Sequence, residues 1–379
     1  MRKKKIVPIV EKFKTIKDPR ISRQKLHSLE EILLLVLCAT ICGADSWRDM
    51  VLFGKEKLSF LREYLPYKNG IPSKSTFCRV FGLLQPEAFK AFFNAWMQMF
   101  QSGICEVIAI DGKALRHSYD RSKGLKSIFM VSAYASKDRL VLAQQKVDEK
   151  SNEITAVPEL LKLLNLEGAV VTLDAMGCQK STVKDITDYG GDYAISLKGN
   201  QSNLHKDVAL YLESAIDKGI QKEQCVTHQS IDKGHGRLEV RTCWMTENID
   251  WIPGKENWAG FKSIGMIESS RTLSKGTTLE RLFFISSLSA NPELFLSVIR
   301  DHWRVENNLH WTLDVTFGED GSRVRDRNAT ENMAMIRHAT LNLLQQAKPH
   351  YDKDISIKGL RKKAGWGNET LARILSQKF

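Results

Sequence analysis

Two aspartates in matching contexts are the first candidates for chemistry in this sequence. Asp111 follows the apolar run VIAI, Asp174 follows the apolar run VVTL, and a small residue comes after each. A carboxylate at the end of a buried strand lies at the mouth of an α/β sheet, where ligands and metals commonly bind. On neighbouring strands, the two side chains could bridge a pair of hard cations. Either aspartate alone could equally be a turn former or a helix cap.

Glu306 is the candidate for a third carboxylate. It lies in the segment DHWRVENNLHW, which the spacing of apolar residues predicts to be helical. On such a helix Trp303, Glu306 and His310 share a face, whereas Arg300 and Arg304 lie on other sides. A glutamate with aromatic and imidazole neighbours on its own face is unlike an ordinary solvated charge. We therefore group Glu306 with the two aspartates as metal ligands.

The elements that must position these residues fall into four stretches. Residues 1–100 repeat apolar positions every three or four residues, which predicts an all-helical N-terminal domain. Within it, a helix starting near Pro72 and Ser73 could be the recognition helix of a helix-turn-helix, or an ordinary surface helix with a polar face.

From residue 104 the pattern changes to short β-rich runs, and residues 101–200 read as strand, strand, strand, helix, strand, helix, strand. This order predicts an α/β core with a mixed sheet in three layers. Residues 201–297 have alternating strand patterns and read as a β-rich insertion. Residues 298–379 return to helices, beginning with the helix that carries Glu306.

The basic excess of the chain lies at its two ends. The net charge is +12, and residues 1–27 and 353–379 contribute +8 and +5, which leaves residues 28–352 at −1. Basic arms suit sequence-independent contacts with nucleic acid phosphates, although they could also be plain solvated tails. The seven cysteines are odd in number and include no CxxC pair, which favours a reduced, cytoplasmic protein. The apolar run at 32–42 is too short for a membrane span.

A long series of ordered motifs resembles the DDE transposases of bacterial insertion sequences, and more narrowly the H-repeat-associated proteins of Rhs elements. The motifs cover nearly the whole chain: LLLVLCATICGADSW, IAIDGKALRHSYD, DEKSNEITAVPELL, TLDAMGCQK, SLKGNQ, GHGRLEVR and HWRVENNLHWTLDVTFGED. The resemblance implies an RNase H-like catalytic core with a β-rich insertion before the catalytic helix. It also implies that Asp111, Asp174 and Glu306 are the catalytic triad and the metal ligands.

The activity implied by the resemblance is DNA strand cleavage, as an endonuclease, followed by strand transfer into target DNA. The cofactor would be two Mg²⁺ ions, with Mn²⁺ as a substitute. The partners would be the terminal inverted repeats and target DNA, bound by a homodimer, with no membrane. The expected location is the cytoplasm, in association with the nucleoid.

Further residues are candidates for contact with DNA. Many relatives carry Tyr, Arg and Lys at the positions of Ile299, His302 and Leu313, so other residues near Glu306 would have to grip phosphate. The full set of candidates is Lys113, Lys180, Lys198, Asn200, His235, Arg237, His302, Arg304 and His310. The lysines could instead serve solubility, and the segment with His235 and Arg237 could simply be a tight glycine turn. Glu319 and Asp320 could assist the site or solvate a turn.

Two rival functions use the same features. One is a nuclease derived from a transposase, which would cut DNA without joining it, and the other is a DNA-binding protein without catalysis. A nucleotide-binding enzyme is disfavoured because neither GxGxxG nor GxxxxGK[ST] occurs in the sequence.

Overall fold

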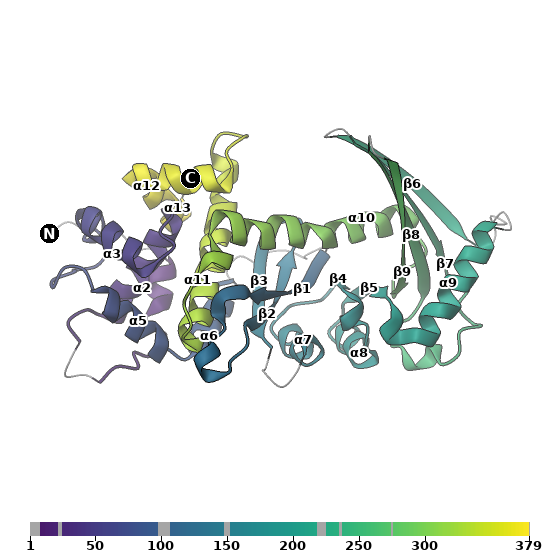
Figure 1. Cartoon of the computed structure of the whole chain (residues 1–379), viewed down its shortest axis with the longest axis horizontal. Coiled ribbons are helices and arrows are strands. Elements are labelled where there is room, and N and C mark those ends of the chain that lie inside the picture. Colours follow the sequence, from purple (N-terminus) through teal and green to yellow (C-terminus); the bar gives the residue numbers. More distant parts are fainter. Residues whose placement is uncertain are drawn as a thin grey trace.

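A mixed nine-stranded sheet runs through the larger part of the molecule, in the strand order β3-β2-β1-β4-β5-β9-β8-β7-β6 (Figure 1). The computed structural model describes residues 8–21, 25–97, 107–147, 152–217, 225–234, 237–273 and 276–378. Helices cover both faces of the sheet, which confirms the predicted mixed α/β class.

The first five strands follow the predicted order. β1 (Val107–Leu115), β2 (Ile128–Ala135) and β3 (Leu140–Lys146) form two consecutive antiparallel pairs. Next come α7 (Glu153–Leu161), β4 (Val170–Leu173), α8 (Lys180–Asp188) and β5 (Asp192–Leu197). β4 is parallel to both β1 and β5. The core strands are largely buried because they are short apolar runs covered on both faces.

The β-rich segment after residue 200 extends the same sheet. β6 (Val226–Gly234), β7 (Arg237–Thr246), β8 (Ser263–Leu273) and β9 (Gly276–Ser286) are antiparallel, and β9 pairs with β5. These strands curve away from the core (Figure 1), and α9 (Ser202–Asp217) packs against β8 and β9.

One helix lies along the face of the sheet and spans both its halves. α10 (Pro292–Arg304) contacts β1, β4 and β5 as well as β6 and β7. α7 and α8 lie on the opposite face (Figure 1). The helix predicted through residue 315 does continue, but as two π-helical turns, Val305–His310 and Thr312–Thr316. π-Helical turns are rare in proteins, and those that occur are often found at functional sites.

The described part of the N-terminal region is helical, as predicted. Its helices are α1 (Pro8–Phe13), α2 (Leu29–Ile41), α3 (Trp47–Glu56), α4 (Leu58–Leu61), α5 (Lys74–Leu83) and α6 (Pro86–Met97). The stretch 47–65, predicted as one helix, is interrupted at Lys57. α2 is apolar on nearly all sides, and it is accordingly buried on nearly all sides.

α11 (Arg327–Ala347) joins the helical region to the sheet and is buried along most of its length. The Asn332 side-chain amide donates to the carbonyls of Phe81 and Leu84, at the end of α5. One turn from the other end of α11, the Asn342 side chain accepts from the Val141 N–H and donates to the Val141 carbonyl, both at 2.9 Å. Asn342 thereby provides hydrogen-bond partners for the backbone N–H and carbonyl of Val141 on the outer edge of β3.

The ends of the chain are folded where they are described, and this corrects the picture of free basic arms. α1 buries Ile9, Val10 and Phe13. At the other end, α12 (Ile357–Trp366) and α13 (Asn368–Ser376) pack on α2. Arg361 of α12 is buried and donates to the Thr40 carbonyl and to Asp45, so its charge serves the fold. Among the described helices none has the length and apolarity to cross a bilayer.

Candidate catalytic site

The two aspartates lie side by side on neighbouring parallel strands. Ile110 of β1 is in register with Leu173 of β4, so the next residues along both strands are Asp111 and Asp174. β4 ends at Leu173, as predicted. β1 continues to Leu115 through its pairing with β2, so Asp111 lies within its strand and not at the strand end that the sequence suggested.

An imidazole from the α10 segment contacts each aspartate. His310 Nε2 lies 3.0 Å from Asp111 Oδ2, and His302 Nε2 lies 3.6 Å from Asp174 Oδ1. The Nδ1 atom of His302 is 2.9 Å from the Thr172 hydroxyl, two residues before Asp174 on the same strand. The interaction with His302 lowers the pKa of Asp174 below its ordinary value, so this carboxylate is ionised at neutral pH.

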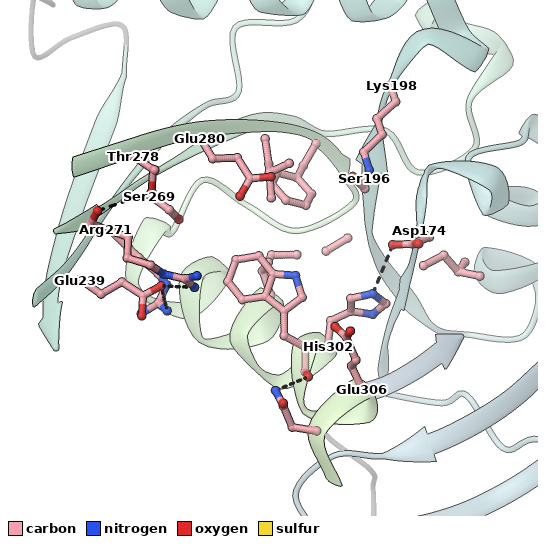
Figure 2. A pocket seen from close by; sticks show the side chains of 18 of the residues that line it. Asp174, Ser196, Lys198, Glu239, Ser269, Arg271, Thr278, Glu280, His302 and Glu306 are labelled. Atoms are coloured by element: carbon pink, nitrogen blue, oxygen red, sulfur yellow. Dashed lines mark hydrogen bonds and ion pairs between the residues drawn. The ribbon is translucent and has the colours of Figure 1, made fainter. Parts of the chain in front are cut away.

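Glu306 and Asp174 line the same cavity, which has a volume of about 460 Å³. Figure 2 shows Asp174, His302 and Glu306 together at one end of this cavity and Arg271 with Glu239 at the other. The remaining lining comes from β5, from strands β7, β8 and β9, and from α10. Both carboxylates are exposed, and Glu306 lies in the π-helical turn that follows α10.

Three side chains at four-residue spacing on this segment lie at the site. His302 contacts Asp174, Glu306 lines the cavity and His310 contacts Asp111. Of the face predicted from the sequence, Trp303 and Glu306 do line the cavity, whereas His310 is directed to Asp111. The switch from α to π geometry, in which hydrogen bonds span five residues, changes the alignment after Arg304 and was not visible in the sequence.

Glu153 is a further carboxylate at the site, and sequence reasoning did not single it out. It is the first residue of α7, and an added Cβ at Gly112 would lie 2.6 Å from its Oε1 atom. Burial raises the pKa of Glu153, and the charges of Asp111 and Asp174 raise it further. The motif NEITAVPELL contains it, but an acidic residue in a first helical turn is common for capping reasons alone.

The donor atoms here fit hard divalent cations. Carboxylate oxygens are the ligands that Mg²⁺ prefers, and Asp111, Asp174, Glu153 and Glu306 supply several of them from different elements. As they stand, no three acidic, histidine or cysteine side chains in the described part of the chain are grouped closely enough to hold an ion. Side-chain rotation, which the exposed Glu306 and Asp174 allow, would have to complete the ligand set.

Lys113 is placed differently from the prediction that it meets phosphate. Its ammonium group pairs with Asp314 and lies 2.8 Å from Glu319 and 3.9 Å from Asp320. Arg337 also pairs with Glu319, at 3.4 Å. Burial alone would raise the pKa of Glu319, but these cations lower it on balance. Glu319 is thus a buried structural partner of Lys113, and Lys113 is two residues after Asp111 in the chain.

The other predicted DNA contacts differ in their surroundings. Lys198 and Arg237 line the cavity with Asp174 and Glu306. Lys180 is exposed at the start of α8. Asn200 and Arg304 engage the protein itself, Asn200 through a 2.6 Å hydrogen bond to the Ala175 carbonyl and Arg304 through a 2.8 Å ion pair with Asp301.

His235 lies outside the described residues.

The far end of the cavity is charged but largely neutralised. Glu239 is buried, and Arg237, Arg241 and Arg271 pair with it at 3.8, 2.6 and 3.4 Å. Arg241 also stacks its guanidinium on Trp303, 5.8 Å from the ring centroid. The Arg241–Trp303 contact joins the curved half of the sheet to the segment of α10.

Comparison with known proteins decides the family. Residues 105–343 match the transposase DDE domain, and residues 10–97 match the DDE_Tnp_1-associated family. The chain belongs to the DDE transposase family. It is 38% identical to "H repeat-associated putative transposase YhhI" of Escherichia coli (strain K12), over 97% of each chain. It is also 44% identical to the uncharacterized protein in dhlA 3'region of Xanthobacter autotrophicus, over 74% of this chain and 94% of that one. A shorter relative, "Inactive transposase YbfQ" of E. coli (strain K12), is 40% identical over 19% of this DDE transposase and 86% of its own length.

Proposed function

We propose that this DDE transposase cleaves DNA at the ends of an insertion sequence and joins the freed ends to target DNA. In this proposal Asp111, Asp174 and Glu306 are the catalytic, metal-binding triad of an RNase H-like core. The observation that supports it most is that Asp111 lies in register beside Asp174 while Glu306 lines one cavity with Asp174.

Two Mg²⁺ ions, or Mn²⁺ in their place, would be held by these carboxylates. When bound, they would supply activation of the attacking oxygen and stabilisation of the leaving oxygen. The chain's own residues would position the ligands: His310 orients Asp111, and His302, itself fixed by Thr172, orients Asp174. Contacts of this kind between an imidazole and a carboxylate fix the orientation of metal-binding side chains. Glu153 would add a further carboxylate beside the two aspartates.

DNA would enter along the cavity that Glu306 lines. Lys198 and Arg237 are the predicted phosphate contacts that line it, and Trp303 adds an apolar surface to the same cavity. Lys180, Asn200, His235, Arg304, His302 and His310 stay predictions as DNA contacts. The terminal repeats of the element and the target DNA would be the two substrates, and a homodimer on paired ends is the assembly that we expect.

The test is an assay with a labelled donor end and an unlabelled target. A transposase gives a covalent donor–target product that depends on added Mg²⁺ or Mn²⁺. Cleavage without that product would contradict strand transfer and indicate a nuclease. Donor DNA that is bound but left intact with either metal would indicate a protein that has lost catalysis.

A further inference from the structure

A second large cavity lies away from the catalytic residues, between the N-terminal helices and the segment that follows the π-helical turns. Its volume is about 540 Å³. Its walls are the first turn of α3, the exposed side of α5, the segment 321–326 and the first turns of α11. We call this the α3–α5 groove.

Four exposed cations line the α3–α5 groove from two sides. Arg48 and Lys74 come from α3 and α5, and Arg323 and Arg325 come from the facing segment. None of the four has an ion pair with any other described residue, whereas Lys113 and Arg337 nearby are fully paired. Like charges gathered in a concave surface create a positive potential that attracts anions.

The carboxylates in the groove do not cancel this charge. Asp45 pairs with the buried Arg361 at 3.1 Å. Asp326 is the N-cap of α11 and accepts from the Ala329 N–H at 2.9 Å. Asp45 is therefore engaged by Arg361, and Asp326 offsets at most one of the four positive charges, so the groove keeps a net positive charge for an external partner.

The shape and the apolar floor of the groove favour a polymer of phosphates and sugars. The floor includes Trp47, Met50 and Met333, and the Trp47 ring stacks on Phe77 with an interplanar angle of 4°. Deoxyribose has apolar faces that can pack on such a floor while its phosphates meet the cationic rim. α3 and α5 both begin at the groove, so the positive ends of their dipoles add to the same potential.

The groove is also connected to the catalytic residues through the chain. Its segment 321–326 begins two residues after Glu319. Glu319 forms an ion pair with Lys113, and Lys113 is two residues after Asp111 in β1. We propose that the α3–α5 groove binds the sugar–phosphate backbone of duplex DNA outside the catalytic cavity. This inference rests on the proposed function, because it assumes that DNA is the substrate.

The experiment measures binding of a short labelled duplex by anisotropy over a range of KCl concentrations, in EDTA so that no cleavage occurs. Two double variants remove charge from opposite walls, Arg323→Ala with Arg325→Ala, and Arg48→Ala with Lys74→Ala. The matched control removes two exposed cations from α7 and α8, Lys162→Ala with Lys184→Ala. Thermal unfolding of each variant verifies that it is folded.

Each groove variant is expected to weaken binding and to reduce the slope of log K against log salt by about 2, one for each lost phosphate contact. The control variant is expected to keep the wild-type slope. Slopes equal to that of the control in both groove variants would overturn the proposal. Competition by an acidic peptide with unchanged DNA slopes would overturn it too, in favour of a protein partner.

The donor-end assay separates this inference from the proposed function. If the wild type neither cleaves nor joins DNA but the groove variants lose salt dependence, the groove proposal stands and the catalytic one falls. If the wild type joins DNA and the groove variants bind it like the control, the reverse holds.

Discussion

The aspartates of the site are paired with imidazoles and not with lysine or arginine. His310 contacts Asp111 and His302 contacts Asp174. An imidazole can orient a carboxylate through a directed contact of one ring nitrogen. Lys113 is engaged by Asp314 and Glu319, whereas the charge of Lys198 acts on Asp174 and adds to the lowering of its pKa by His302. In the proposed function these aspartates are metal ligands and the imidazoles set their orientation.

Removing the charge of Glu153 should affect stability and metal affinity in opposite directions. In metal-free protein its charge is repelled by Asp111 and Asp174, so Glu153→Gln should not lower the free energy of unfolding and should raise it slightly. The same change should weaken Mn²⁺ binding by roughly 10–100-fold, as loss of a supporting carboxylate does in other metal sites. Titration calorimetry and urea unfolding measure the two effects.

The control for Glu153 is Glu159→Gln on the same helix, where the exposed carboxylate pairs with Lys162. It should leave Mn²⁺ affinity unchanged. If Glu153→Gln binds Mn²⁺ as tightly as this control, Glu153 has no part in holding the metal.

His338 gives a prediction on pH. It is buried in α11, and burial lowers its pKa to about 4. In the unfolded chain the His338 side chain has a pKa near 6.5, so between about pH 6.5 and 4 it is protonated in the unfolded state and largely unprotonated in the folded state. The free energy of unfolding therefore falls as the pH drops through this range. The full loss from this residue is roughly 3 kcal/mol.

Urea unfolding at pH 7 and pH 4.5 for the wild type and for His338→Gln measures this effect. The variant should lose less stability than the wild type between the two pH values. An identical loss in both proteins would show that His338 does not cause the acid sensitivity in this window.

At the scale of elements, α11 holds the helical region and the sheet together through buried asparagines. Asn342 satisfies both backbone groups of Val141 on the outer edge of β3. Asn342→Leu keeps the branched shape and the number of side-chain heavy atoms but leaves these two groups without partners, at about 1–3 kcal/mol each. The unfolding free energy should therefore fall by roughly 2–5 kcal/mol.

Gln345→Leu on the same helix is the comparison for Asn342, because Gln345 is only half-buried. It should change stability by about 0.5 kcal/mol or less. Equal effects of the two substitutions in chemical denaturation would mean that the hydrogen bonds to Val141 contribute nothing.

Apolar periodicity was enough to predict the elements of the core and the adjacency of the aspartates. The runs ending at Asp111 and Asp174 are short and apolar, and two such strands in a parallel pair place their following residues together. Periodicity could not reveal the π-helical turns at Glu306, because their spacing depends on the tertiary contacts of His302 and His310. It also could not reveal that β9 pairs with β5, since strand partners are distant in sequence.

The partners of charged side chains were the feature that the sequence predicted least well. Lys113 follows Asp111 by two residues and reads as a phosphate contact, yet it is buried against Glu319, more than 200 positions away. Arg361 reads as part of a basic tail and is instead enclosed between α2 and α12. In both cases the partner comes from a distant segment, which a single sequence cannot identify.

At the scale of the whole molecule, one continuous sheet unites the parts that the sequence suggests are separate. β1 contains Asp111 and Asp174 follows β4, and strands β7 to β9, which curve away from the core in Figure 1, contribute residues to the cavity that Glu306 lines. α10 crosses both halves. A cavity built this way has walls from distant segments and needs no movement of separate domains to form.

We propose that Glu306 acts with the two aspartates in metal-dependent DNA cleavage. This is tested by Mn²⁺-dependent cleavage of the repeat DNA that flanks the element, by the wild type, by Glu306→Gln and by Glu293→Gln. Glu293 is exposed in the first turn of α10, the helix that the π-helical turn of Glu306 continues, and it lies outside the cavity. We predict that Glu306→Gln cleaves at least about 100-fold more slowly while Glu293→Gln matches the wild type. Equal cleavage by Glu306→Gln and the wild type would contradict the account.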